Sequence, residues 1–222
     1  MMDRLRQTII SCHLCPRLVS FRELIASKKR RQFLDWNYWG KPVPGYGDYN
    51  ARLLLVGLAP AAHGGNRTGR VFTGDKSAEF LIRCLFKAGL ANQPTSLASN
   101  DGLELYSTFM TPVLKCVPPD DKPKGEELAN CFPFFLEEFN KLKSIKIILA
   151  LGKIAFDSCL KPFKENYKII KKNYPFGHGN KYLMPDGKVL ISSYHPSPRN
   201  VNTKRLTENI MITLLETVKG EL

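Results

Sequence analysis

Four short runs rich in leucine, isoleucine and valine constrain the fold of this chain more than any other feature of its sequence. They are Arg52–Gly57, Phe109–Cys116, Lys146–Leu151 and Val189–Ser193. Apolar runs of this length are typical of strands that are buried on both faces. Because both faces of such strands must be covered, the runs predict an α/β fold in which helices flank a parallel sheet.

Apolar residues at helical spacing fill the segments between these runs. Ser77–Ala88 and Glu126–Leu142 repeat apolar side chains every three or four residues, so each is predicted to be a crossover helix. A further helix is predicted within Leu18–Arg31, and the repeat from Leu206 to Val218 predicts a helix that closes the fold. Residues 1–222 are therefore predicted to form a single domain.

The chain is strongly basic, with 33 lysine and arginine residues against 20 acidic residues and a formal net charge of +13. A charge of this size favours polyanionic partners. Two basic clusters, Ser27–Gln32 and Lys168–Asn173, are interpreted as solvated faces, although their place in so basic a chain leaves phosphate binding open.

Neither a membrane segment nor a secretory signal is predicted. The longest nearly apolar runs, Leu53–Ala62 and Ile147–Leu151, are far shorter than the roughly 20 residues that a membrane helix needs. Arg4 and Arg6 interrupt the N-terminus, where a secretory signal would need a longer apolar core. We therefore expect a protein of the reducing cytoplasm that does not bind membranes, and we expect it to be a monomer.

Four cysteines have the spacing and neighbours of metal ligands. Cys12 and Cys15 form a C-x2-C pair, whereas Cys116 and Cys131 are separated by fourteen residues. Four thiolates can fill a zinc site or hold a 4Fe-4S cluster, and the open spacing of the second pair favours the cluster. The alternative is that all are buried apolar side chains, as is expected of the remaining two cysteines.

A glycine-containing turn follows the first predicted strand. Its residues, Gly57-Leu58-Ala59-Pro60, can present backbone amides to an anion or a polar ring at the carboxyl end of the sheet. The later run Gly69–Ser77 resembles a phosphate-binding loop, but Asp75 separates its glycine from its lysine, so an NTPase is excluded. Asp75 is either a functional acid or the N-cap of the next helix.

The last predicted strand leads into the motif HPSPRN, His195–Asn200. This motif therefore lies at the same edge of the predicted sheet as the Gly57 turn. Its two prolines restrict the backbone around His195. A histidine at the same edge as a glycine turn and Asp75, in a basic protein, favours a chemical role over a structural one.

These motifs resemble those of the uracil-DNA glycosylase superfamily, most closely its family five, type B. The resemblance rests on Gly57–Asp75, on His195–Asn200 and on the order of the four cysteines, and it extends from end to end of the chain. It implies a three-layer α/β/α sandwich with a central four-stranded parallel sheet. It also implies a structural 4Fe-4S cluster on the four cysteines, and removal of uracil and some other deaminated bases from DNA. No lysine lies beside these motifs in a way that suggests a Schiff base, so we expect hydrolysis without strand cleavage.

The resemblance implies a role for each residue at a matching position. Phe72 would stack on the flipped base, and the backbone of Gly57, Leu58 and Ala59 would line the pocket. His195 would hydrogen-bond the uracil O2 atom.

The remaining implied roles belong to charged and amide side chains. Asp75 would be the acid that faces the sugar or orients the attacking water. Arg199 would enter the duplex at the place that the base has left. Asn66 and Arg67 are candidates for the rim of the pocket.

One position departs from the family pattern. Related cluster-bearing glycosylases carry an asparagine in the strand before the third cysteine, where this chain has Thr111-Pro112-Val113. Proline supplies no donor, so Thr111 or backbone groups are the predicted substitutes and a wider base range is expected. The alternative function is a non-catalytic iron-sulfur or zinc protein that binds nucleic acid on the same fold. A redox protein is a weaker reading, because no second cofactor site is indicated.

Overall fold

A six-stranded mixed sheet lies at the centre of the computed structural model, which describes residues 2–222. Its strand order is β1-β3-β2-β4-β6-β5, and the four inner strands are parallel. The strands are β1 Tyr46–Gly47, β2 Leu53–Gly57, β3 Thr108–Pro112, β4 Ile147–Leu151, β5 Lys181–Leu183 and β6 Val189–Ser193. The predicted four-stranded parallel sheet is present, and each edge is extended by a short antiparallel strand.

The edge strands and the end of β3 differ from the sequence prediction. β1 has two residues and β5 has three, too few for an apolar pattern to reveal. The second predicted strand, Phe109–Cys116, corresponds to β3 and ends at Pro112. Proline has no amide hydrogen for the sheet ladder, and the two residues after it donate their amides to the turn that follows β2.

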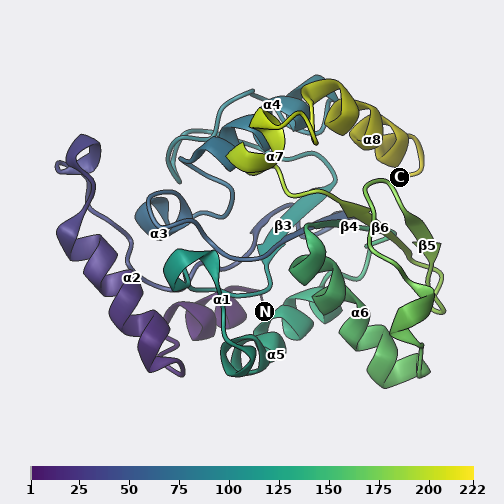
Figure 1. Cartoon of the computed structure of the whole chain (residues 1–222), viewed down its shortest axis with the longest axis horizontal. Helices are drawn as coiled ribbons and strands as arrows, with labels where there is room; N and C mark the ends of the chain where they lie inside the picture. Colours follow the sequence, from purple (N-terminus) through teal and green to yellow (C-terminus); the bar gives the residue numbers. More distant parts are fainter. Residues whose placement is uncertain (1) are drawn as a thin grey trace.

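Helices cover both faces of the sheet. They are α1 Met2–Ile10, α2 Pro16–Lys28, α3 Gly65–Thr68, α4 Lys76–Lys87, α5 Gly125–Lys141, α6 Lys153–Tyr167, α7 Pro198–Asn202 and α8 Glu208–Gly220, with short 3-10 turns η1 Arg31–Phe33, η2 Pro119–Asp121 and η3 Lys171–Asn173. α4 and α8 lie on one side of the sheet, and α1, α5 and α6 lie on the other (Figure 1). The expected three layers are therefore present.

Strand side chains alternate between two cores. Leu53 and Leu55 of β2 belong to the core beneath α4 and α8. Leu54 and Val56 belong to the core that α5 and α6 complete. Because successive side chains of a strand point to opposite faces, a strand covered on both sides is apolar at every position.

Four helices were predicted from the sequence, and α2, α4, α5 and α8 match them within a few residues. α1, α3, α6 and α7 were not predicted. α6 contains Pro162, a residue that is unfavourable inside a helix, but α5 also contains a proline, Pro133. Within residues 2–222, no helix combines the length and the apolar character that crossing a bilayer requires.

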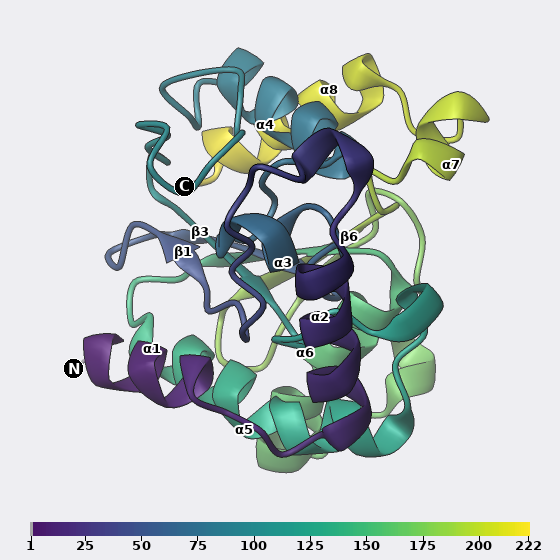
Figure 2. The same ribbon diagram turned by 90° about the vertical axis from the view of Figure 1, so that its left-hand side faces the viewer.

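The carboxyl ends of the parallel strands share one edge of the sheet, where the functional motifs gather. The turn after β2 leads into α3, and the chain after β6 leads into α7. The coil that follows α2 passes over α3 (Figure 2), where the amides of Trp39 and Gly40 donate to the carbonyls of Arg67 and Asn66. This edge therefore joins segments that lie far apart in the sequence.

Candidate active site at the carboxyl edge of the sheet

A cavity of about 280 Å³ opens where β2, β3 and β6 end. It is lined by Gly57, Leu58, Ala59, Pro60, Ala61, Val71, Phe72, Asp75, Ser77, Pro112, Asp121, His195, Ser197 and Pro198. Ligand pockets commonly occupy about 300–1,000 Å³, so this cavity suits a small ring. Six of the site residues predicted from the sequence meet here, from two motifs more than a hundred residues apart.

Phe72 forms one wall of the cavity against Gly57. A Cβ atom on Gly57 would lie 2.7 Å from the Phe72 Cζ atom, so only glycine lets the ring lie here. The Phe72 backbone has a φ of +47°, a conformation that is unfavourable for a bulky residue. Its ring centroid lies 6.5 Å from that of His195, with 32° between the planes. A strained turn thus fixes an aromatic ring beside the imidazole.

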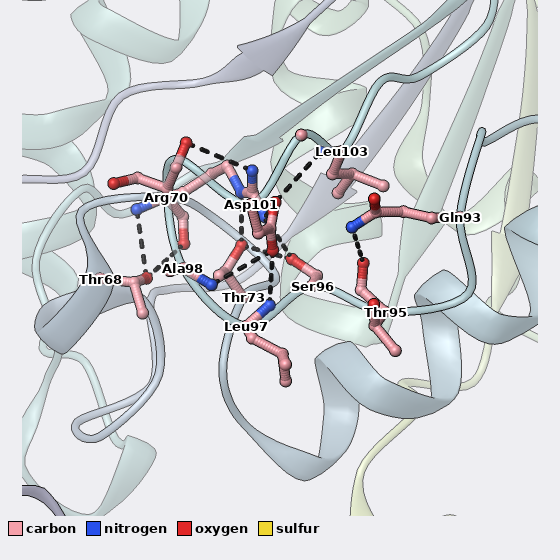
Figure 3. Close-up of polar contacts among 12 residues, drawn as sticks. Thr68, Arg70, Thr73, Gln93, Thr95, Ser96, Leu97, Ala98, Asp101 and Leu103 are labelled. Carbon is pink, nitrogen blue, oxygen red and sulfur yellow. Dashed lines mark hydrogen bonds and ion pairs between the residues drawn. The ribbon is translucent and has the colours of Figure 1, made fainter.

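Arg70 and Asp101 brace the turn that carries Phe72 (Figure 3). Arg70 Nη2 donates to both Asp101 carboxylate oxygens at 2.8 Å, and Arg70 Nε donates to Thr73 Oγ1 at 2.8 Å. Burial alone would raise the pKa of Asp101, but hydrogen bonds from Arg70 and from three amides of the 97–103 loop lower it overall. An ionised Asp101 therefore holds the turn at neutral pH.

Asp75 lies at the cavity and also caps the next helix. Its Oδ1 atom accepts hydrogen bonds from the amides of Ser77 at 2.9 Å and Ala78 at 3.1 Å, so it caps α4. Among residues 2–222, no donor reaches its Oδ2 atom, which lies against Gly64. Burial raises the pKa of Asp75, whereas the two amides and the charge of Arg67 oppose that rise. One oxygen is thus fixed by the helix, and the other remains available at the cavity.

His195 presents an unpaired imidazole to the cavity. The Asn200 side chain donates to the His195 carbonyl at 2.8 Å, which fixes the backbone. Burial lowers the pKa of His195 to about 4, so the ring is neutral at pH 7. A neutral imidazole carries one N–H donor, and no hydrogen-bond partner for the ring occurs in the described part of the chain. That donor is free for a ligand.

Asn66 and Arg67 do not lie at the cavity, contrary to their predicted place on its rim. Asn66 is buried in α3, and its Nδ2 atom donates to the Arg22 carbonyl at 3.1 Å. Arg67 is buried between two aromatic rings. The direction of a four-residue helix decides where both side chains point. Arg199 is exposed on α7, next to Pro198 of the cavity wall.

Thr111 cannot act as the predicted substitute for asparagine, because its side chain is fully buried and already bonded. Its hydroxyl donates to Glu138 and accepts a hydrogen bond from Lys115 Nζ at 2.7 Å. Pro112 reaches the cavity, but its carbonyl accepts from Lys115 Nζ at 2.7 Å. β3 therefore offers no free side-chain donor to a ligand.

Asp121 is a cavity residue that the sequence reasoning missed. It is exposed, with a φ of +57°, and lies at the end of η2. Its negative charge adds to the rise in the pKa of Asp75. The two acids after Pro119 were the only sequence signal for it.

A second cavity is lined by all four cysteines that were predicted as ligands. Cys12 and Cys15 lie in the loop between α1 and α2, Cys116 follows β3, and Cys131 lies on α5. In the described residues, no three histidine, cysteine or acidic side chains surround a single metal-ion position. Four thiols around one cavity are a donor set that a 4Fe-4S cluster can use.

Nitrogen donors point at three of these sulfur atoms. They are Arg22 Nη1 at 3.1 Å from Cys116 Sγ, Lys115 N at 3.2 Å from Cys131 Sγ, and Asn130 Nδ2 at 3.7 Å from Cys15 Sγ. Hydrogen bonds of this kind favour thiolate sulfur, so the donor set fits an iron-sulfur cluster. Cys84 and Cys159 lie in the two cores of the sheet instead, as the sequence predicted.

A buried ion pair connects the two cavities. Lys115 Nζ lies 2.5 Å from Glu138 Oε2, and both side chains are almost completely buried. The same lysine bonds the Pro112 carbonyl through its side chain and the Cys131 sulfur through its backbone amide. The floor of the first cavity and the cysteine site therefore share one rigid support.

Comparison with known proteins gives consistent matches over nearly the whole chain. Residues 44–219 match the Uracil DNA glycosylase superfamily. A type-5 uracil-DNA glycosylase from Thermus thermophilus is 45% identical over 213 residues, which cover 96% of this chain and 94% of that protein. A type-5 uracil-DNA glycosylase from Pyrobaculum aerophilum is 44% identical over 207 residues, with 93% and 87% covered. A type-4 uracil-DNA glycosylase from Sulfurisphaera tokodaii is 28% identical over 193 residues, with 84% and 77% covered.

Proposed function

The chain belongs to the uracil-DNA glycosylase superfamily, and on this premise we propose that it is a DNA repair hydrolase that excises uracil from DNA. It hydrolyses the N-glycosidic bond between base and sugar and does not cleave the strand. The similarity to type-5 enzymes covers more than nine-tenths of the chain, which favours an enzyme over the non-catalytic nucleic-acid-binding alternative.

The observation that carries this proposal is the meeting of Phe72, Asp75 and His195 at one cavity. A base inside a duplex must leave the stack before an enzyme can act on it, at a cost of a few kcal/mol. The cavity receives that base, and Phe72 offers an aromatic ring for stacking. The turn braced by Arg70 and Asp101 keeps the ring in place before the base arrives.

The two titratable side chains face opposite charges in the reaction. As the bond between the sugar C1′ and the base nitrogen breaks, the sugar becomes cationic and the uracil becomes an anion. The neutral His195 ring donates its N–H to the uracil oxygen that gains negative charge. The free Asp75 Oδ2 faces the sugar cation. Water then bonds to C1′, and the proton that it loses neutralises the uracil anion through the solvent, so the products are free uracil and a C1′ hydroxyl. Among residues 2–222, no lysine lines the cavity to form a Schiff base instead.

We propose that the base range is wider than uracil. A pocket rejects a related base most strongly when it holds a polar group that the wrong base leaves unpaired. β3 offers Pro112 to the cavity, and Thr111 beside it is already bonded to Lys115 and Glu138. We therefore expect hypoxanthine and xanthine to be released as well as uracil.

We propose that Cys12, Cys15, Cys116 and Cys131 hold a 4Fe-4S cluster. When bound, this group supplies a cross-link between the α1–α2 loop, the segment after β3 and α5. None of the reaction steps uses it, because the thiols line a different cavity from Asp75 and His195. We further propose that the enzyme acts as a monomer in the cytoplasm, on DNA and without a membrane.

The test is a base-release assay on oligonucleotides that carry uracil, hypoxanthine or xanthine opposite each partner base. We expect free base and an intact strand that breaks only after alkali. Uracil opposite guanine should react faster than uracil opposite adenine, because a mispaired base is easier to flip. A protein that binds these duplexes but releases no base would support the non-catalytic alternative instead.

A further inference from the structure

A basic segment is attached, through Arg67, to the loop that carries Phe72 and Asp75 of the cavity. We call residues 28–36 the basic wing; it contains the end of α2, the 3-10 turn η1 and the coil that follows it. Lys28, Arg30 and Arg31 are exposed. Within residues 2–222, none of these three side chains has an ion-pair or hydrogen-bond partner. Their charges are therefore available to a ligand.

The basic wing is attached to the loop that forms the cavity wall. The guanidinium carbon of Arg67 lies 3.9 Å from the ring centroids of both Phe33 and Trp36. Arg67 also donates to the His63 carbonyl at 2.7 Å and to the Gly74 carbonyl at 3.0 Å. Gly74 directly precedes Asp75, which lines the cavity. Arg67 therefore fixes the position of the wing relative to Asp75.

The charge of the basic wing also acts on that loop. Burial lowers the pKa of His63, and the positive charges of Arg30 and Arg67 lower it further. His63 follows Ala61 of the cavity wall by two residues. Arg30 therefore lies close enough to the loop that follows the cavity residue Ala61 for its charge to act on that loop.

We propose that the basic wing binds phosphates of the DNA strand beside the flipped nucleotide. The proposal rests on the proposed function in taking DNA as the partner. Duplex DNA carries one negative charge per about 1.7 Å of its axis, so three unpaired cations on an anchored segment can neutralise about three phosphates. The helix α7, which carries Arg199, lies on the same side of the molecule (Figure 2), so DNA on the wing can reach the cavity as well.

The test compares two triple variants that remove equal charge. The wing variant carries Lys28→Gln, Arg30→Gln and Arg31→Gln. The control carries Lys164→Gln, Lys168→Gln and Lys172→Gln, which change three exposed lysines without side-chain partners in residues 2–222. The control lysines lie at the end of α6 and in η3, on the opposite side of the molecule from α2 (Figure 1).

Affinity for a fluorescent duplex without uracil is measured over a range of salt concentrations. The slope of log affinity against log salt should fall by about 0.9 for each lost phosphate contact in the wing variant, and should stay near the parent value in the control. Base release in a single turnover at saturating DNA should remain within about twofold of the parent. Equal slopes for the two variants would overturn the proposal. Because the duplex lacks uracil, this result does not depend on whether the chain releases bases.

The variant Trp36→Ala tests the attachment of the wing, since it keeps every charge and removes half of the aromatic pair around Arg67. We expect weaker duplex binding and a smaller salt slope, because a loosened wing no longer holds its cations in register with the phosphates. A parent-like slope in this variant would show that the anchored position is not needed and would overturn that part of the proposal.

Discussion

Asp75 caps α4 with one carboxylate oxygen, and its other oxygen is the acid of the reaction that we propose. Sequence reasoning placed the residue correctly but left a helix cap and a functional acid as alternatives. The structure shows the cap and places the same residue at the sheet-edge cavity, so the two alternatives are compatible. An anion at this position also benefits from the N-terminal end of the α4 dipole.

Replacing Asp75 by asparagine separates the two roles. Asparagine caps helices about as well as aspartate, so Asp75→Asn should keep the free energy of unfolding within a few tenths of a kcal/mol. Asp75→Ala should lose about 1 kcal/mol. Both should slow single-turnover uracil release by about 100- to 1000-fold, because each removes the charge that faces the sugar. Near-parent turnover in Asp75→Asn would limit the residue to capping.

His195 should remain neutral well below the usual pKa of histidine. Its pKa is lowered to about 4 in the folded chain and is about 6.5 when unfolded, so protons favour the unfolded chain. The free energy of unfolding should therefore decrease as pH falls from about 6.5 towards 4, because the unfolded chain binds a proton that buried His195 does not. NMR of the imidazole at pH 6 should report the neutral form. A half-protonated ring near pH 6.5 would contradict the buried site.

At the scale of elements, the apolar runs were sufficient to predict the parallel strands. They did not predict the side-chain contacts that hold the loops around those strands. Runs such as IILAL have no polar position, so only a strand covered on both faces fits them. The brace between Arg70 and Asp101 joins residues about thirty positions apart and leaves no local pattern. The same is true of Asn66, whose direction depends on how the short helix α3 packs against α2.

Removing Asp101 should weaken the turn that carries Phe72. Asp101→Ala leaves the guanidinium of Arg70 buried without its partner, so the free energy of unfolding should fall by about 3 kcal/mol at pH 7. The pKa of Asp101 is lowered in the folded chain, so its contribution exists above the unfolded value of about 3.9 and disappears as pH falls through the folded value. Urea unfolding should therefore show that the difference in free energy of unfolding between Asp101→Ala and the parent becomes smaller as the pH falls from about 7 to about 3.

The control for this prediction is Asp35→Asn, which changes an exposed carboxylate without a side-chain partner among residues 2–222. Its stability should follow that of the parent at every pH. If the free energy of unfolding falls equally little in Asp101→Ala and in Asp35→Asn, the ion pair between Arg70 and Asp101 does not stabilise the turn.

At the scale of the whole molecule, the cysteine site and the base cavity are two parts of one rigid body. Lys115 lies between them and bonds to both, through its backbone on one side and its side chain on the other. The sequence could locate the four cysteines, because their neighbours resemble ligand loops. It could not show that a buried ion pair joins them to the floor of the cavity, because Lys115 and Glu138 give no pattern of their own.

The cofactor proposal predicts a brown protein that contains iron and sulfide after anaerobic purification. Cys131→Ser should lose most of the visible absorption and the iron, because it removes one of four thiolates. Cys84→Ala and Cys159→Ala should retain both, since these residues lie in the cores of the sheet. A colourless parent protein that contains zinc would contradict the proposal.

The edges of the sheet bear on how this protein behaves at high concentration. A long, flat edge strand offers unpaired amides and carbonyls to any other chain and promotes aggregation. Here β1 stops after two residues and β5 after three, and β5 ends the sheet with exposed Lys181 paired to Glu221. Both edges are therefore poor templates for strand addition, and a chain with a net charge of +13 also repels its own copies. We therefore expect a crowded solution of this protein to resist fibre formation.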